Sequence, residues 1–229
     1  FYDEYDVDAS YVGHPLLDEM LKLKSVNRKV FLKQNNLDPK KEVIALLPGS
    51  RKQEVSRMLE VMLKMVDEYP NYQFVIGCAP SLPESFYKSI IDKENVHLLF
   101  NKTYPLLQVA SAALVTSGTA TLETALLYVP EVVCYKGNKI SYLIAKNLIK
   151  VKYICLVNLI MDKPVIKELI QNDLTPENIK QELDLLLTNH AKQRAVLEDY
   201  DELRHVLGDA GASDNAASII VSDLKKDIR

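Results

Sequence analysis

Short apolar runs alternate with amphipathic segments through the middle of the chain. The apolar runs are typical of strands that are buried on both faces of a sheet, and they cover 43–47, 74–77, 96–99, 112–115 and 132–134. Apolar spacings of three and four, with helix start and stop signals, predict helices over 54–69, 83–93, 105–111 and 119–128. Because strands alternate with helices, we expect an α/β fold with a Rossmann-like, doubly wound parallel sheet.

The two ends of the chain differ from this centre. From residue 140 onward the pattern is helical, and it predicts helices over 140–150, 163–172, 176–188, 191–206 and 211–226. Near the start, Ala9–Val12 predicts a strand without a partner in sequence, followed by a turn at Gly13-His14-Pro15 and two short helices. We therefore expect residues 1–36 to be the tail of a preceding domain, 37–41 a linker, and 37–229 a Rossmann-like domain with C-terminal helices.

Composition and charge narrow the class of protein. The 229 residues carry 28 Lys and Arg against 31 Asp and Glu, a net charge of −3, which excludes the basic surface that duplex nucleic acid requires. The three cysteines, Cys78, Cys134 and Cys155, are far apart in the sequence. This spacing favours buried thiols in a reducing compartment over a disulfide or zinc framework. With no long apolar run and no signal peptide at the start, we expect a cytoplasmic chain without a transmembrane helix.

Two strand-to-helix turns carry the candidate chemistry, and in a chain with only 7 glycines each contains one. The first is Gly49-Ser50-Arg51, where glycine permits close backbone approach and the arginine fork suits phosphate. The second is Ser117-Gly118-Thr119, which opens a helix whose N-terminus can hold an anion. Glu123, one turn further on, can accept hydrogen bonds from a ribose diol or cap its own helix.

Each of these signals alone is also typical of a structural turn or an ordinary helix cap. The carboxyl ends of parallel strands meet at one edge of the sheet, so both turns are expected together there. Together they favour a nucleoside-diphosphate ligand. The chain has neither Gly-x-x-x-x-Gly-Lys-Ser/Thr nor Gly-x-Gly-x-x-Gly, which counts against a P-loop or a dinucleotide site.

These turns belong to a longer set of motifs that closely resembles the C-terminal part of the lipid-A-disaccharide synthases, the glycosyltransferases of lipid A assembly. Their order and spacing hold over essentially all of the chain. The matching motifs are Gly13-His14-Pro15, Leu47-Pro48-Gly49-Ser50-Arg51, Ser117-Gly118-Thr119-Ala120-Thr121-Leu122-Glu123, Tyr135-Lys136 and Leu156-Val157-Asn158-Leu159.

The resemblance implies a metal-independent hexosyltransferase of the GT-B type, with two Rossmann-like domains and no cofactor. In that family the C-terminal domain takes UDP-2,3-diacylglucosamine and the N-terminal domain takes 2,3-diacylglucosamine 1-phosphate (lipid X). The products are lipid A disaccharide 1-phosphate and UDP, on the way to the lipopolysaccharide of Gram-negative bacteria. The resemblance also implies peripheral association with the inner face of the inner membrane and homodimers with exchanged C-terminal segments.

The resemblance assigns residues of this chain to parts of the UDP-sugar donor. The diphosphate would meet Gly49, Ser50, Arg51, Ser117, Gly118 and Thr119. The ribose would meet Glu123, the uracil Phe100 and Asn101, and the sugar or a phosphate Asn158, beside which Val157 replaces the usual proline. On this interpretation residues 1–36 are the remnant of the acceptor domain. The general base lies in the missing part, so we expect the chain to bind donor and not to turn over.

Other interpretations stay open at this point. The Ser-Gly-Thr turn with Glu123 also fits a UDP-N-acetylglucosamine 2-epimerase, a MurG-like transferase or a non-catalytic nucleotide-binding module. His14 is expected to be a turn residue bonded to backbone rather than a substrate contact. The segment 139–152 combines apolar residues with the lysines Lys139, Lys146, Lys150 and Lys152. It fits either a contact with an anionic membrane surface or, as the plainer interpretation, a solvated helix with one buried face.

Overall fold

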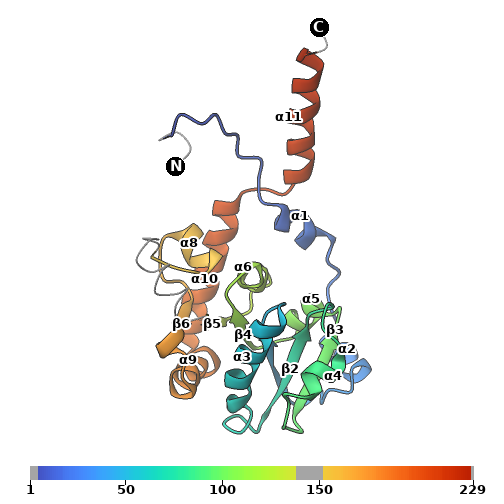
Figure 1. The fold of residues 1–229 in the computed structure, drawn as a ribbon, viewed down its shortest axis with the longest axis vertical. Coiled ribbons are helices and arrows are strands. Elements are labelled where there is room, and N and C mark those ends of the chain that lie inside the picture. The colour runs from blue at the N-terminus through green and yellow to red at the C-terminus, as the bar shows by residue number, and fades with distance from the viewer. Residues whose placement is uncertain (1–4, 138–151, 228–229) are drawn as a thin grey trace. The chain divides into compact units, whose positions relative to one another are not determined.

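The centre of the chain forms one parallel sheet, as predicted. The computed structural model describes residues 5–137 and 152–227. Its six strands are β1 (Glu42–Leu47), β2 (Tyr72–Cys78), β3 (Val96–Phe100), β4 (Ala112–Thr116), β5 (Glu131–Tyr135) and β6 (Lys167–Ile170). Their order in the sheet is β3-β2-β1-β4-β5-β6 and every pairing is parallel, which is the doubly wound Rossmann order (Figure 1).

Helices follow the strands in turn. Between strands lie α3 (Lys52–Met62) with the 3-10 turn η2 (Leu63–Met65), α4 (Glu84–Lys88), α5 (Thr103–Leu107), α6 (Thr119–Leu126) and α8 (Leu156–Met161). Before the sheet come α1 (Pro15–Lys22) and α2 (Arg28–Gln34); after it come η3 (Gln171–Asp173), α9 (Pro176–Thr188), α10 (His190–Leu207) and α11 (Ala212–Asp227). The helix predicted over 83–93 is thus shorter than expected, whereas those over 176–188, 191–206 and 211–226 are confirmed.

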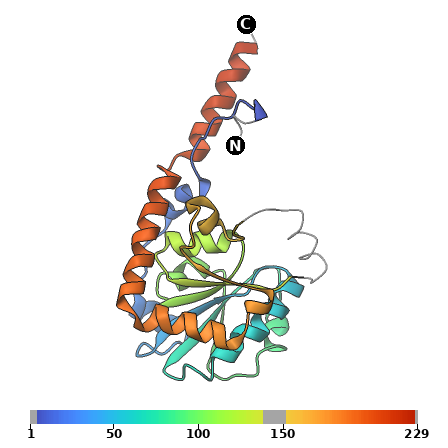
Figure 2. The same cartoon turned by 90° about the vertical axis from the view of Figure 1, so that its left-hand side faces the viewer.

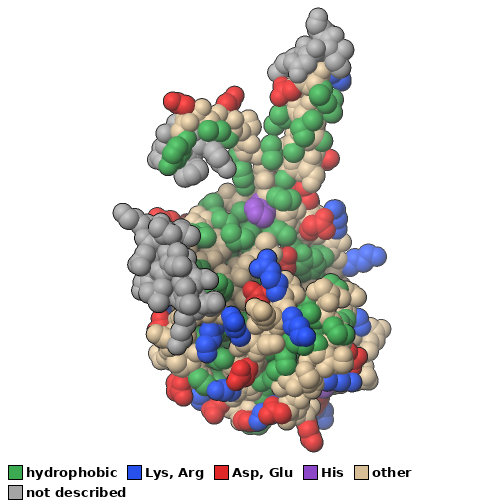
Figure 3. All heavy atoms as spheres, viewed as in Figure 1, with side chains coloured by type: hydrophobic (Ala, Val, Ile, Leu, Met, Phe, Trp, Pro, Cys, Tyr) green, Lys and Arg blue, Asp and Glu red, His purple; other side chains and the backbone are tan. Residues whose placement is uncertain are grey.

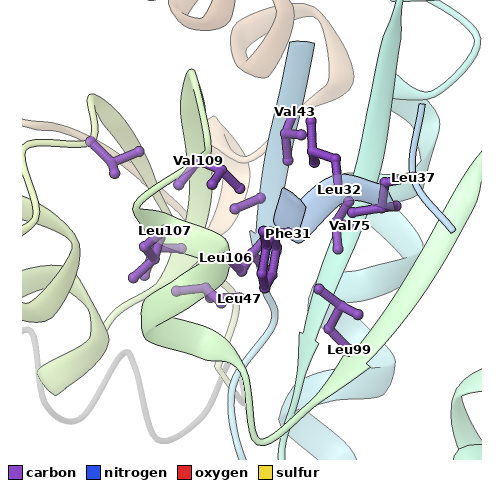
Figure 4. Close-up of a cluster of buried hydrophobic side chains, with 14 residues drawn as sticks. Phe31, Leu32, Leu37, Val43, Leu47, Val75, Leu99, Leu106, Leu107 and Val109 are labelled. Atoms are coloured by element: carbon purple, nitrogen blue, oxygen red, sulfur yellow. The ribbon is translucent and has the colours of Figure 1, made fainter. Parts of the chain in front are cut away.

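Helices cover the sheet on both faces, which explains the continuous apolar runs of its strands. On one face, Phe31 and Leu32 of α2 pack with Val43 of β1 and Val75 of β2 (Figure 4). Ile44, which alternates with Val43 along β1, is also fully buried. Helix α9 contacts β4, β5 and β6, and Figure 2 shows it in orange against the sheet.

The chain divides into compact units at a different point from the one expected. One unit holds the N-terminal segment up to Lys24 together with the C-terminal segment from Arg204, and the other is Ser25–Leu203. Leu37 is buried in the core with α2, so 37–41 is not a linker between units. The short amphipathic pattern of α2 indicated a helix but not the core to which its apolar face belongs.

The unit formed by the two ends has its own internal contacts. The Asp18 carboxylate on α1 accepts hydrogen bonds from the backbone N–H groups of Gly211 and Ser213 at the start of α11, and these bonds lower its pKa. His14 accepts a hydrogen bond from the N–H of Leu16 at 3.2 Å, so it is the turn residue expected. The strand predicted over Ala9–Val12 was wrong: these residues pair with no strand of the described chain.

The segment after β5 contains the other corrections. The helix predicted over 163–172 was wrong, because Lys167–Ile170 is strand β6, paired with β5 from Val132↔Lys167 to Tyr135↔Ile170. A four-residue strand is defined by its partner, which lies far away in sequence. The predicted helix over 140–150 and the lysines Lys139, Lys146 and Lys150 lie outside the described residues.

The cysteines and the helices agree with the remaining sequence-based expectations. Cys78, Cys134 and Cys155 are buried and unpaired, and burial raises the pKa of the first two thiols to about 12. Within the described ranges, none of the helices combines the length and apolar character that crossing a membrane requires.

Candidate functional site

Both predicted turns line one cleft at the carboxyl edge of the sheet. It lies between β1 and β4, where the strand order reverses, and we call it the switch-point cleft. Its volume is about 350 Å³. Its lining includes all predicted residues of the two turns: Gly49, Ser50, Arg51, Ser117, Gly118, Thr119 and also Glu123.

The first turn is held in shape by an acidic residue that the sequence-based prediction did not assign to the site. Glu54, in the first turn of α3, accepts a hydrogen bond from the N–H of Ser50 at 3.0 Å. Gly49 has a φ of +106°, and a Cβ there would lie 2.6 Å from Glu54 Cγ. This φ and the close Glu54 side chain favour glycine at this position. An acidic residue early in a helix is a known cap signal, which could have indicated Glu54.

Arg51 supplies a cation to the switch-point cleft. It is the exposed N-cap residue of α3, and its side chain makes no capping hydrogen bond. Among residues 5–137 and 152–227, no carboxylate forms an ion pair with it. Its guanidinium is thus available to a ligand, and its planar fork matches phosphate oxygens.

The second turn presents a helix N-terminus to the same cleft. Gly118 is the N-cap of α6, with φ 158° and ψ −165°, so the cap residue has no side chain to bond the first turn. The N–H of Thr121 donates to the Gly118 carbonyl oxygen at 3.2 Å. In the described structure the N–H groups of Thr119 and Ala120 donate to no protein acceptor, so they keep their hydrogen-bonding capacity at the positive end of the helix dipole. The Ser117 hydroxyl instead donates to the carbonyl oxygen of Ile154 at 2.9 Å, which fixes the loop in place.

Glu123 is half-buried at the wall of the cleft, one turn into α6. Burial raises its pKa, and a hydrogen bond with Tyr104 of α5 opposes that shift. In the part of the chain that the structure describes, no N–H of the first turn of α6 donates to Glu123, so it is not the helix cap. The carboxylate can accept hydrogen bonds from a diol. Tyr104 was not foreseen, because only the fold brings α5 beside α6.

Phe100 and Asn101 do not line the switch-point cleft. Phe100 ends β3, and its ring packs edge-to-face on Tyr87 with 5.8 Å between centroids. Asn101 follows with a left-handed φ of +56°. Their expected contact with uracil stays a prediction.

Asn158 has a different place from the one expected. It is buried on α8 and lies outside the switch-point cleft. Its amide group donates to the Ile166 carbonyl oxygen at 2.8 Å and to Glu168 Oε1 at 3.1 Å, and its Oδ1 accepts from the N–H of Ile166 at 2.9 Å. Because the chain itself uses these groups, Asn158 has a structural role, and its expected contact with sugar or phosphate stays a prediction.

A chain of hydrogen bonds connects Asn158 to the second turn of the switch-point cleft. The Glu168 carboxylate on β6 accepts from the N–H groups of Ile154 and Cys155, at the start of α8. The Ile154 carbonyl oxygen in turn accepts from the Ser117 hydroxyl. Asn158 therefore supports the second turn indirectly. Sequence reasoning missed Glu168, since nothing local links it to residue 154.

A metal-binding cluster is not among the described features. Within residues 5–137 and 152–227, no group of three or more His, Cys, Asp or Glu side chains is placed to share a metal ion.

The sheet order defines the protein as having the fold of one half of a GT-B glycosyltransferase. Solved structures share that fold. WaaG, a glycosyltransferase of lipopolysaccharide biosynthesis, matches with a TM-score of 0.56 and 16% identity over 86% of this chain and 52% of its own. A UDP co-structure of S. aureus MnaA matches with a TM-score of 0.62 and 14% identity over 93% of this chain and 53% of its own.

Sequence comparisons assign the chain to one family among the proteins with this fold. Residues 1–220 match the family model of the lipid-A-disaccharide synthetases, and the chain belongs to that family. A lipid-A-disaccharide synthase of Syntrophus aciditrophicus is 41% identical over 98% of the chain, and one of Coxiella burnetii is 36% identical over 96%. The chain spans 60% and 58% of these two relatives. Membership sets aside the epimerase and MurG-like alternatives.

Proposed function

We propose that this chain is the donor-binding part of a lipid-A-disaccharide synthase. The whole enzyme transfers 2,3-diacylglucosamine from its UDP donor to 2,3-diacylglucosamine 1-phosphate, giving lipid A disaccharide 1-phosphate and UDP. The observation that carries the proposal is the switch-point cleft, where the Arg51 cation, the N-terminus of α6 and the Glu123 carboxylate line one cavity. These groups suit a diphosphate and a ribose diol.

The mechanism follows from where charge develops. As the bond from the sugar C1 to the diphosphate breaks, negative charge grows on UDP. Arg51 and the N–H groups of Thr119 and Ala120 stabilise that charge, because these residues already line the cleft. The acceptor 6-hydroxyl attacks C1 from the opposite face, and a general base outside this chain takes its proton.

The transfer is proposed to need no cofactor and no metal, because the cations for the leaving group come from the protein itself. Arg51 and the α6 N-terminus supply them. UDP affinity measured with and without EDTA should therefore be the same, and a large loss with EDTA would refute this part.

Both substrates carry acyl chains, so we propose that the whole enzyme works at the inner face of the inner membrane. We also propose that it forms a homodimer with exchanged C-terminal segments. The exposed apolar residues of α11 are compatible with such an exchange; they are Ile219, Ile220, Val221 and Leu224.

Calorimetric titration of the chain with UDP tests the proposal. We expect binding, a loss of roughly tenfold or more in Arg51→Ala, and an unchanged affinity in Arg194→Ala, a matched exposed arginine on α10. Equal affinity in Arg51→Ala and wild type would contradict the phosphate assignment. We also expect no disaccharide from the isolated chain, and efficient synthesis by it would contradict the placement of the base elsewhere.

A further inference from the structure

A second cleft adjoins the switch-point cleft on the side of α3 and β5. We call it the α3–β5 cleft; its volume is about 330 Å³. The two clefts share Arg51, Glu54 and Thr116. The rest of the second cleft comes from α3 and from the end of β5, including Arg57 and Lys136, neither of which lines the first cleft.

Positive charge dominates the α3–β5 cleft. Its lining holds Arg51, Lys52, Arg57 and Lys136 against the single carboxylate of Glu54. Lys52 lies over the Phe86 ring, 5.6 Å from its centroid. No Asp or Glu of the described ranges forms an ion pair with Arg57 or Lys136. Figure 3 shows Lys and Arg side chains gathered on the face viewed in Figure 1. Such a concentration of one charge sign attracts an anion.

Thr116 lines both clefts, and its hydroxyl is buried without a hydrogen-bond partner among the described residues. This residue ends β4 and is 3% exposed. The nearby Thr121 and Thr124 hydroxyls instead donate to backbone carbonyl oxygens, at 2.8 and 2.7 Å. Unsatisfied buried hydroxyls are uncommon, and a ligand oxygen next to Thr116 would satisfy this one.

The donor does not account for these groups. A nucleoside diphosphate in the switch-point cleft is matched by Arg51 and the α6 N-terminus, which leaves Arg57 and Lys136 unused. The remaining positive charge and the unpartnered hydroxyl would suit a second anion beside the donor.

We propose that the α3–β5 cleft binds a phosphomonoester, the phosphate group of the acceptor sugar. This inference rests on the proposed function and deepens it, because it assigns part of the acceptor to the donor-binding chain. Arg57 holds the phosphate with its planar fork and Lys136 with a mobile point charge. The acceptor then contacts both halves of the enzyme. Binding of the acceptor phosphate here helps to bring the acceptor 6-hydroxyl to the donor sugar.

The test is an NMR titration of the chain saturated with UDP. The probes are glucosamine 1-phosphate, inorganic phosphate and glucosamine. We expect the two phosphates to bind without displacing UDP and to shift the signals of Arg57 and Tyr135, whereas glucosamine shifts neither.

Arg57→Gln and Lys136→Gln should each weaken binding of glucosamine 1-phosphate by about tenfold, since each removes a charge-assisted contact. The exposed control Arg194→Gln should leave it unchanged. UDP affinity should stay at the wild-type value in all three variants, which separates this proposal from the donor assignment. Competition of glucosamine 1-phosphate with UDP, equal binding of glucosamine, or unchanged phosphate affinity in Arg57→Gln and Lys136→Gln would each overturn it. If the wild-type chain does not bind UDP, the proposed function itself is refuted.

Discussion

Replacing Asn158 by alanine separates a structural role from a ligand contact. The side chain is 1% exposed and makes three hydrogen bonds, two with the backbone of Ile166 and one with Glu168. The substitution leaves the N–H and the carbonyl oxygen of Ile166 without these partners inside the protein. It also removes one of the groups that hold Glu168 at the start of α8.

The expected cost follows from these contacts. A buried hydrogen bond contributes about 1 kcal/mol net, and an unsatisfied buried group costs at least as much, so Asn158→Ala should lower the free energy of unfolding by about 3 kcal/mol. For a chain of this size that corresponds to a fall in Tm of roughly 6–12 °C. Asn172→Ala, at an exposed position without a side-chain hydrogen bond in the described structure, should change Tm little.

Urea unfolding and UDP titration together provide the assay. At a temperature where the variant is folded, UDP affinity should fall only a few-fold, because the second turn keeps its own backbone groups. A loss of UDP affinity of a hundredfold or more with unchanged stability would refute the reasoning and restore Asn158 as a donor contact.

Two further changes probe the fold around the site. Gly49→Ala places a Cβ against the Glu54 side chain at a φ of +106°. It should lower the free energy of unfolding by about 1–3 kcal/mol and weaken UDP binding. An unchanged Tm would contradict the described packing of this turn. Glu131 is buried, neither of its carboxylate oxygens has a partner in the described structure, and burial raises its pKa well above the ordinary value. Because its folded pKa exceeds its unfolded one, the wild type should lose stability relative to Glu131→Gln as the pH rises from about 5 to 8, and a constant difference in urea midpoints would contradict this.

The parts of the fold that could be predicted are those with local signals. A strand buried on both faces must be apolar throughout, so β1 to β5 were recognisable as runs. Strand β6 was not, because its four residues become a strand only by pairing with β5. Helix α8 and the core position of α2 likewise depend on neighbours that are distant in sequence.

The same distinction holds for the site. The residues of the two turns are consecutive in sequence, and parallel strands bring both turns to one edge, so Arg51 and Ser117–Thr119 could be foreseen together. Glu168 and Tyr104 act through contacts across the fold. Asn158 was assigned from a motif, and a motif does not show whether an amide faces a ligand or the chain's own backbone.

A crystal structure of this chain with UDP would locate the donor. We expect the diphosphate on the Arg51 guanidinium and on the first N–H groups of α6, with the ribose hydroxyls on Glu123. A diphosphate bound away from the turns at Gly49-Ser50-Arg51 and Ser117-Gly118-Thr119 would contradict this expectation.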